Sequence, residues 1–527
     1  MAFLLGQILL FGYGRDQGIY AMVGRAVVAG KMPYRDAWDF KPPGIFLIYA
    51  LSRALFGGAQ IGIRVVEVAG LVAMTAAMVR LTERWWGDRR VGLLAGAIAV
   101  LVHAQLEFWH TAQPESFGGM LTVFALLALG PIGGSEPPVA IDDGAPDRAT
   151  LRRWALCGAV FGFTGLLKPP LAGGGAVVAV ALGLRALRAH AASPLGPRLR
   201  AALLPAAVVA AGGLAPIALC LLWFLARGAQ RELWDVLFVF TPHYTRLSWV
   251  GESLGGMTYW GFTEWLCTYC SVPTVGFLLF LAHPPRPRER LGAAIIAGII
   301  AVHLAGVILQ GKFFPYHYGA TWPLTALLAA LGFVRVWDRL AARGPLGVAA
   351  FLAGFTAVLF FRTATKDVEG TFLQRCAERM ALYTASPRDQ AAIDRLASVA
   401  DVNAAANREV AAFLRARVPE GRAVFVWGFE PVIYDLADRT PAARYLYDVP
   451  QRVAWAKDKE RATLMRDLDA GRPAAIVVER RDVFPMVTGD AIDSADTLKS
   501  FAGLRDRLAE RYALAATIED FDVYLER

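Results

Sequence analysis

The sequence predicts a polytopic α-helical membrane protein that ends in a small water-soluble α/β domain. The chain has 527 residues, of which 56% are hydrophobic and only 19% are charged, whereas a soluble domain has about 25% charged residues. Apolar runs of about 15–25 residues recur up to residue 361, and a helix needs roughly 20 such residues to cross a bilayer. From residue 363 onward charges are frequent and no long apolar run remains.

These patterns divide the chain into a transmembrane domain, 1–362, and a globular domain, 363–527, that is long enough for a core of its own. The first outer loop covers 14–44, and the half-length apolar tract 44–57 is expected to lie at the membrane surface. About eleven crossings are predicted. They are 1–13, 61–82, 91–109, 116–132, 154–167, 171–187, 202–226, 261–282, 291–309, 319–336 and 345–362.

The net charge of +9 is interpreted as a topology signal rather than as a nucleic-acid site. With the N-terminus in the cytoplasm, every inner loop is basic and the short outer turns carry little positive charge, as the positive-inside rule requires. Eleven crossings then place the C-terminal domain outside the cytoplasm. This placement depends on the short spans 154–167 and 171–187. If they formed one broken span, the number of crossings would be even and the later basic loops would lie outside the cytoplasm.

The C-terminal domain is expected to begin with a helix over 388–417, where apolar residues recur at helical spacing. Buried strands are predicted at 423–427 and 474–478, with one or two more in 512–525. Strands that alternate with helices indicate an α/β domain. It has no glycine motif for a nucleotide.

The first outer loop has the densest set of chemically active residues. Asp16 directly follows the first membrane helix. Partial desolvation at this membrane edge would raise the pKa of its carboxyl group and make it a better proton acceptor. The alternative is a solvated acid at the interface without a catalytic role.

This loop resembles those of multi-spanning GT-C glycosyltransferases, in particular glycosyltransferase family 39 and its bacterial relatives. The relatives include protein O-mannosyltransferases, lipid A aminoarabinose transferases and lipopolysaccharide-core transferases. The resemblance is carried by Asp16, Pro33-Tyr34-Arg35-Asp36, Asp39 and Lys41-Pro42-Pro43-Gly44. Supporting tracts are Ile63-Arg64, Gln113-Pro114-Glu115-Ser116, Lys168-Pro169-Pro170, Phe314-Pro315-Tyr316-His317-Tyr318, Trp322-Pro323-Leu324 and, in the C-terminal domain, Val426-Trp427-Gly428-Phe429-Glu430-Pro431 with Arg439.

The resemblance implies an inverting transfer of one hexose or pentose from a polyprenyl-phosphate donor to an extracytoplasmic acceptor. The acceptor is lipid A or lipopolysaccharide, another glycan, or a protein, and the reaction is expected at the outer face of the bacterial cytoplasmic membrane. Asp16 is the expected base. Relatives often have two adjacent acids where this chain has Asp16-Gln17, so Asp39 or Glu115 is a candidate for the second acid.

Cations near the outer membrane edge are candidates to bind the departing phosphate, because buried charge there is costly and usually functional. The predicted donor phosphate-binding residues are Lys41, Arg64, Lys168, Arg246, Lys312 and His317. The predicted catalytic residues are Asp16 and Asp39, and the predicted substrate-binding residues are Asp36, Glu115 and Tyr316. Alternative interpretations are cations that snorkel to the lipid headgroups, a Glu115–Lys168 ion pair and a structural Tyr316–His317 pair.

No cofactor is required by the sequence. Asp16, Asp39, Glu115 and His317 could bind a divalent metal ion, but no ligand spacing demands one. Two other functions fit a multi-span protein. A transporter or lipid flippase would explain the many spans but not the outer domain or the acid-rich loop. A receptor would need residues 365–527 but not Asp16.

Overall fold

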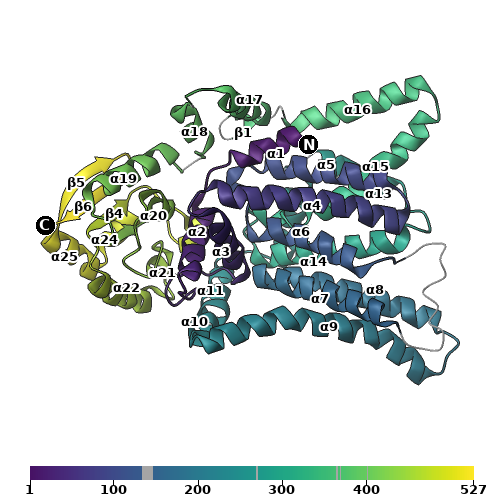
Figure 1. Ribbon diagram of the computed structural model, residues 1–527, viewed down its shortest axis with the longest axis horizontal. Helices are drawn as coiled ribbons and strands as arrows, with labels where there is room; N and C mark the ends of the chain where they lie inside the picture. The colour runs from purple at the N-terminus through teal and green to yellow at the C-terminus, as the bar shows by residue number, and fades with distance from the viewer. Residues whose placement is uncertain (133–145, 269–270, 364–365, 368–369, 388, 400–401) are drawn as a thin grey trace.

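The computed structural model describes residues 1–132, 146–268, 271–363, 366–367, 370–387, 389–399 and 402–527. Figure 1 shows an elongated molecule in which a bundle of roughly parallel helices occupies one end and the C-terminal domain occupies the other. The short helices α2 (Arg15–Val28) and α3 (Gly44–Phe56) lie between the two parts. The first outer loop is therefore placed at the junction of the bundle and the domain.

The bundle has the length and composition of a membrane domain. Within the described residues, four segments are long and apolar enough to cross a bilayer: Ile61–Trp86, Pro169–Ala189, Leu195–Ala226 and Arg290–Gln310. The prediction of a polytopic membrane protein is thus confirmed, while the number eleven stays a prediction. The remaining bundle helices are α1 (Ala2–Leu9), α5 (Arg89–Gln105), α6 (Pro114–Leu129), α7 (Arg148–Leu167), α12 (Leu254–Thr263), α13 (Ser271–Ala282), α15 (Trp322–Ala341) and α16 (Pro345–Thr363).

The predicted single span over 261–282 is not one straight helix. Leu254–Cys267 and Ser271–Ala282 meet at an angle of 106°. A π-helical turn, Glu264–Thr268, ends the first helix, and Pro273 stands in the first turn of the second. Proline is tolerated in a first turn because the amide it lacks would have no helical partner there. Hydropathy alone does not detect such a bend.

The two short spans on either side of Lys168 are separate helices. Helix α7 ends at Leu167, Lys168 is extended with φ −159° and ψ 120°, and α8 (Gly173–Ala189) follows a 3₁₀ turn at Pro169–Ala172. Both helices pack against α9 (Leu195–Ala226). Lys168 therefore lies at the turn between two bundle helices.

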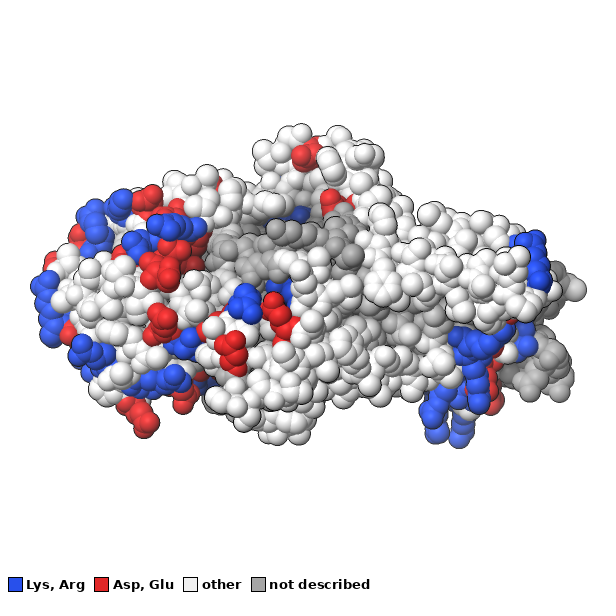
Figure 2. Space-filling view, turned by 90° about the horizontal axis from the view of Figure 1, so that it is seen from above, with Lys and Arg blue, Asp and Glu red and all other residues white. Residues whose placement is uncertain are grey.

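Charge is distributed unevenly along the molecule. On the face shown in Figure 2, lysine, arginine and acidic side chains gather over the C-terminal domain and at the far end of the bundle. Further charged side chains lie where the bundle meets the domain, and the stretch of the bundle between that junction and its far end is almost free of charge. An uncharged belt between two charged ends is what a lipid bilayer requires of a protein that crosses it.

The C-terminal domain is built on a four-stranded sheet with the order β3-β4-β6-β5. Strand β3 (Val424–Trp427) runs parallel to β4 (Ala475–Glu479), and the crossover between them contains α20 (Val432–Ala437), α21 (Val449–Arg452) and α22 (Lys457–Gly471). Strands β6 (Phe521–Glu526) and β5 (Tyr512–Ile518) continue the sheet in antiparallel fashion. The strands lie where the sequence predicts them.

The helical part of the domain differs from its prediction. Helices α18 (Gln390–Leu396) and α19 (Ala404–Arg417) replace the single helix expected over 388–417, of which residue 388 lies outside the described part. Asn403 accepts a hydrogen bond from the amide of Ala406 and thereby starts α19 anew. The other helices are α17 (Phe372–Thr384), α23 (Pro485–Thr488), α24 (Ser494–Lys499) and α25 (Ala502–Arg511).

Candidate active site

Asp16 stands in the first turn of α2, at the end of the bundle that faces the C-terminal domain. Its Oδ2 accepts a hydrogen bond of 3.2 Å from the side-chain amide of Gln113. The amide oxygen of Gln113 in turn accepts a hydrogen bond of 3.0 Å from the hydroxyl of Tyr20. The positive end of the helix dipole favours a carboxylate at this position. Asp16 is therefore oriented but remains partly exposed.

Gln17, the residue that takes the place of a second acid, has a structural role. It is fully buried, and its Oε1 accepts a hydrogen bond from the amide of Gly14 at the start of the helix. Its Nε2 faces three backbone carbonyl groups, those of Phe108, Trp109 and Thr111, at 3.2, 2.9 and 2.7 Å. A donor is needed at this position, so a carboxylate would not fit the same contacts.

Asp39 is a buried acid close to Asp16. Its Oδ1 accepts a hydrogen bond of 2.7 Å from the hydroxyl of Tyr447, and its Oδ2 lies 3.4 Å from the amide nitrogen of Lys41. Burial raises the pKa of Asp39 to about 6, although Lys41 and Tyr447 act in the opposite direction. The negative charge of Asp16 also raises it.

Lys41 reaches the same region because α3 begins against the end of α7. A Cβ atom on Gly44 would lie 2.7 Å from the carbonyl oxygen of Leu166, so only glycine permits this approach. The ammonium group of Lys41 lies 5.6 Å from the ring centre of Tyr316. Among the described residues it forms no ion pair.

Lys168 and Lys312 are the other two lysines of the site. Lys168 pairs with Glu115, whose second oxygen is buried without a hydrogen-bond partner in the described part of the chain. Lys312 donates to the backbone carbonyl of Met486 and lies 4.1 Å from the ring centre of Tyr244. Burial, and next the charge of Lys41, lower the pKa of Lys312 to about 8.

His317 lies at the centre of these cations. Burial lowers the pKa of its imidazole well below the usual range, and the charges of Lys168, Lys41 and Lys312 lower it further. The ring is therefore neutral at neutral pH. Its Nδ1 is buried and has no partner among the residues that the structure describes. A neutral imidazole with a free nitrogen can bind a substrate by hydrogen bonding.

Comparison with solved structures gives the fold. The chain matches ArnT from Cupriavidus metallidurans bound to undecaprenyl phosphate with a TM-score of 0.59 and 14% identity, over 99% of this chain and 95% of that one. It matches the apo state of the same protein with a TM-score of 0.58 and 15% identity, over 99% and 96%. ArnT is a GT-C glycosyltransferase. This chain has the GT-C fold.

The archaeal oligosaccharyltransferase AglB from Archaeoglobus fulgidus also matches, with a TM-score of 0.44 and 13% identity over 91% of this chain and 68% of that one. No protein-family model and no curated protein matches the sequence. The GT-C resemblance of the first outer loop is thus confirmed at the level of the fold.

Within this GT-C fold, most of the predicted site residues come together. Asp16, Asp39, Lys41, Glu115, Lys168, Lys312, Tyr316 and His317 are linked by hydrogen bonds, ring contacts or direct charge interactions. They come from five separate parts of the bundle. The burial of Tyr316, followed by the charges of Asp16 and Glu115, raises the pKa of its phenol well above the usual range, so the phenol stays protonated.

Three predicted residues lie elsewhere in the GT-C fold. Arg64 is fully buried and pairs with Glu67 at 2.9 Å within α4 (Ile61–Trp86). Arg246 ends α11 (Thr241–Arg246) as an exposed side chain. Asp36 pairs with its neighbour Arg35 at 2.9 Å and stabilises the loop itself. Within the described part of the chain, none of them contacts the cluster around His317.

Four residues of the cluster were not predicted from the sequence. Gln113, Tyr244 and Tyr447 each contact one of the two acids or one of the lysines, and Tyr20 donates a hydrogen bond to Gln113. Gln113 belongs to the tract Gln113-Pro114-Glu115-Ser116, whose resemblance to the family could have indicated a role in the site. Tyr447 is separated from Asp39 by 408 positions in the sequence, and no local pattern marks it.

The C-terminal domain holds the start of α2 through Arg15. The guanidinium of this residue lies 2.9 Å from Glu430 and 3.8 Å from Glu479, and it stands 4.5 Å from the ring centre of Phe484. Burial, followed by repulsion from Glu430, raises the pKa of Glu479 well above its usual range. Arg15 precedes Asp16 directly, so the domain holds the helix turn that carries the candidate base.

The described residues include no group of three or more histidine, cysteine, aspartate or glutamate side chains that could hold a metal ion. The acids of the cluster have other partners: Asp39 has Tyr447, and Glu115 has Lys168.

Proposed function

We propose that the protein is a glycosyltransferase of the bacterial cytoplasmic membrane. It transfers one sugar, with inversion, from a polyprenyl-phosphate donor to an acceptor at the outer face. The observation that carries this proposal is the cluster itself. Three carboxylates, those of Asp16, Asp39 and Glu115, lie with three lysines and a neutral histidine at the end of a membrane bundle and beside the C-terminal domain.

The acids suit the acceptor side of the reaction. A hydroxyl group that attacks the sugar must lose its proton, and a carboxylate within hydrogen-bond reach can take it. Asp16 is partly exposed and oriented by Gln113, so it is the proposed base. Asp39 is buried beside it and is proposed as the second acid, in place of one at Gln17.

The cations suit the donor side. The lipid phosphate gains negative charge as the sugar leaves, and cations already in place stabilise that charge without rearrangement. Lys41 has no ion-pair partner in the described chain, and Lys168 and Lys312 stand with it around His317. ArnT, one of the solved structures that this chain matches, was solved with undecaprenyl phosphate, which supports a lipid-phosphate donor.

The proposed orientation places the site and the C-terminal domain outside the cytoplasm. The basic inner loops of the sequence support it, since cytoplasmic loops carry an excess of arginine and lysine. A donor that is itself a lipid can then enter laterally from the membrane. The acceptor is an envelope glycolipid, another glycan or a protein, and it approaches from the side of the soluble domain.

The test compares envelope glycolipids and glycoproteins by mass spectrometry in a deletion strain complemented with variants. We expect one sugar to be missing in the deletion strain and in a strain with Asp16→Asn, while wild type restores it. Asp88→Asn is the matched control. Asp88 caps α5 at the opposite end of α4, where asparagine caps equally well, so this variant should restore the sugar.

Two results would contradict the proposal. Full restoration by Asp16→Asn, at the same protein level in the membrane, would remove the candidate base. A deletion strain with an unchanged sugar content, but with lipid or solute transport lost, would favour a transporter or flippase instead.

A further inference from the structure

One segment of the C-terminal domain lies directly on the first outer loop. The amide of Trp38 donates a hydrogen bond of 2.7 Å to the carbonyl of Arg444, and Trp38 pairs with Tyr445 in a short parallel bridge. The ring of Trp38 also lies 5.8 Å from that of Tyr447. The backbone next to Asp39 is thus held by the domain.

The contact ends at a candidate catalytic acid. Tyr447 donates its hydroxyl to Oδ1 of Asp39 at 2.7 Å, and both side chains are 1% exposed. The other carboxylate oxygen has a longer contact, 3.4 Å from the amide of Lys41. A hydrogen bond to a charged group is roughly twice as strong as a neutral one. The hydroxyl of Tyr447 therefore dominates the orientation of the Asp39 carboxylate.

We propose that Tyr447 is a positioning residue of the active site, which holds the Asp39 carboxylate in its working orientation. The C-terminal domain is then part of the catalytic unit and not a separate binding module. This inference rests on the proposed function and assigns to that same site a residue from the other domain.

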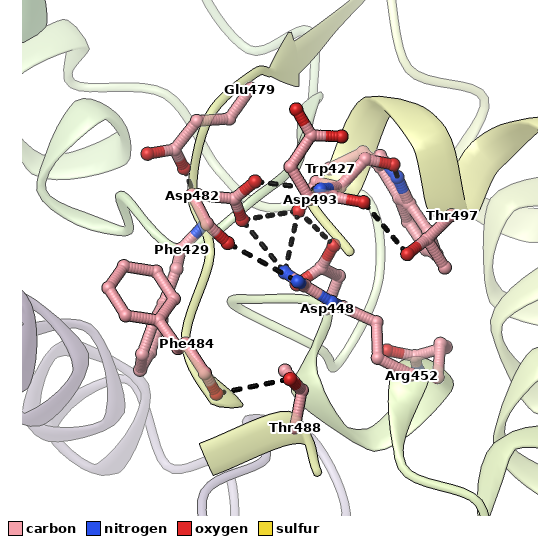
Figure 3. Close-up of polar contacts among 12 residues, drawn as sticks. Trp427, Phe429, Asp448, Arg452, Glu479, Asp482, Phe484, Thr488, Asp493 and Thr497 are labelled. Atoms are coloured by element: carbon pink, nitrogen blue, oxygen red, sulfur yellow. Dashed lines mark hydrogen bonds and ion pairs between the residues drawn. The ribbon is translucent and has the colours of Figure 1, made fainter. Parts of the chain in front are cut away.

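The residue after Tyr447, Asp448, belongs to a buried ionic network with Arg452 and Asp482 (Figure 3). The amide of Asp448 donates a hydrogen bond to the carbonyl of Gly428 at 3.2 Å. Its carboxylate accepts the hydroxyl of Ser494 at 2.6 Å and lies 3.5 Å from Arg452, which pairs with Asp482 at 2.8 Å. All these groups belong to the domain. Most polar groups of this buried network have hydrogen-bond partners, so the network makes the backbone next to Tyr447 rigid. The hydroxyl of Tyr447 therefore donates from a fixed position.

The bundle and the C-terminal domain also contact each other at a second point, next to Asp16. Two such contacts beside two candidate acids are not explained by chance. Arg15 of the bundle enters the same domain beside Phe429 and Phe484, 2.9 Å from Glu430. The C-terminal domain therefore contacts Arg15, which precedes Asp16, and the side chain of Asp39. A binding module that only recruits an acceptor would need neither contact.

The charge state of Asp39 offers a readout that a purely structural role would not change. The titratable groups that face its carboxylate are Lys41, Asp16, Tyr20, Tyr34, Tyr244 and Tyr447. Burial raises the pKa of Asp39 to about 6, and the hydroxyl of Tyr447 lowers it. Removal of that hydroxyl must move the pKa upward, since the ionised form loses its donor.

The experiment measures sugar transfer against pH for the full-length protein in lipid nanodiscs, with a polyprenyl-phosphate-linked sugar. In parallel, infrared difference spectra follow the carboxylic acid band that Asp39→Asn abolishes. Tyr447→Phe should shift the acidic limb and the band midpoint upward by about one pH unit, as expected for a lost charged hydrogen bond. Its transfer rate should recover as the pH is raised.

Tyr445→Phe is the matched control. Tyr445 is equally buried and also packs on Trp38, but its hydroxyl donates to Glu460 within the domain. Its midpoints should stay at the wild-type values. Should Tyr447→Phe not fold, 3-fluorotyrosine at residue 447 replaces it. This stronger donor should move both midpoints downward.

The outcomes separate the two proposals. Unchanged midpoints in Tyr447→Phe or the fluorinated protein, with Asp16→Asn inactive, overturn the role of Tyr447 and leave the glycosyltransferase standing. If wild type transfers no sugar from any lipid-phosphate donor, the proposed function fails. The infrared midpoint then decides alone whether Tyr447 controls Asp39.

Discussion

Replacement of Arg64 by methionine tests whether this cation belongs to the scaffold or to the donor site. Its side chain is fully buried and donates five hydrogen bonds. The acceptors are the carbonyls of Phe11, Gly12 and Phe108, the hydroxyl of Thr111 and the carboxylate of Glu67. Four of these acceptors belong to the two chain segments that precede Asp16 and Gln113.

The expected loss of stability in Arg64→Met follows from the ion pair between Arg64 and Glu67. Methionine fills most of the same volume but removes the Arg64 guanidinium from the buried Glu67, which keeps His103 at 2.8 Å. The loss of one partner of a buried pair costs about 3–5 kcal/mol. That cost corresponds to a fall in the melting temperature of roughly 5–10 °C. We expect Arg64→Met to melt at this lower temperature in detergent or nanodiscs. Below that temperature its affinity for a polyprenyl phosphate should be close to that of wild type.

The double variant Arg64→Met/Glu67→Gln sharpens the test. It leaves no uncompensated charge, so it should be less destabilised than the sum of the two single variants. If Arg64→Met kept the wild-type melting temperature but no longer bound a polyprenyl phosphate, the assignment of Arg64 to the scaffold would be refuted. Arg64 would then belong to the donor site, as the sequence suggests.

Three further substitutions follow from the site. Lys41→Met should lower the rate of sugar transfer by about 100-fold, as expected when one preformed charge is removed. Its melting temperature should stay unchanged because no ion pair is lost, and a melting temperature that falls together with the rate would contradict this role. Gln17→Glu places a carboxylate against three carbonyl groups and should destabilise the protein by about 1–3 kcal/mol, which thermal unfolding would show; a stable and more active variant would show that a second acid belongs there. Lys312 has a pKa of about 8, lowered first by burial and then by Lys41, so donor affinity should fall as the pH rises past that value and the ammonium loses its proton. Lys312→Arg should abolish this alkaline loss in a donor titration, because arginine stays charged, and a wild-type affinity that is constant across this range would exclude the role.

The parts of the site that the sequence predicts are those with local causes. Asp16 follows an apolar helix, and Asp39, Lys41 and Gly44 belong to one short tract, so their proximity is a property of the loop. The close approach of Gly44 to Leu166 also explains why the tract brings Lys41 near Lys168. Membrane helices are predictable for a similar reason, since each must satisfy its own backbone hydrogen bonds.

The remaining parts depend on contacts between distant segments. Arg64 and Lys41 look alike in sequence, as single cations near the outer edge of the membrane. Only the fold shows that Arg64 faces Glu67 and a ring of carbonyls, while Lys41 faces Tyr316 and has no ion pair among the described residues. Tyr447 could not be predicted either, because its partner Asp39 lies 408 positions away.

This contrast gives a physical criterion for the function of a buried cation. A charge near lipid costs free energy unless partners compensate it. Where five acceptors compensate a guanidinium, as for Arg64, the charge is used to build the fold. Where an ammonium such as that of Lys41 forms no ion pair among the described residues and interacts with Asp39 at longer range, it can still bind an anion from outside the chain. A phosphate at the membrane edge is the anion that we propose, and the C-terminal domain contacts Arg15, the residue before Asp16, and the carboxylate of Asp39.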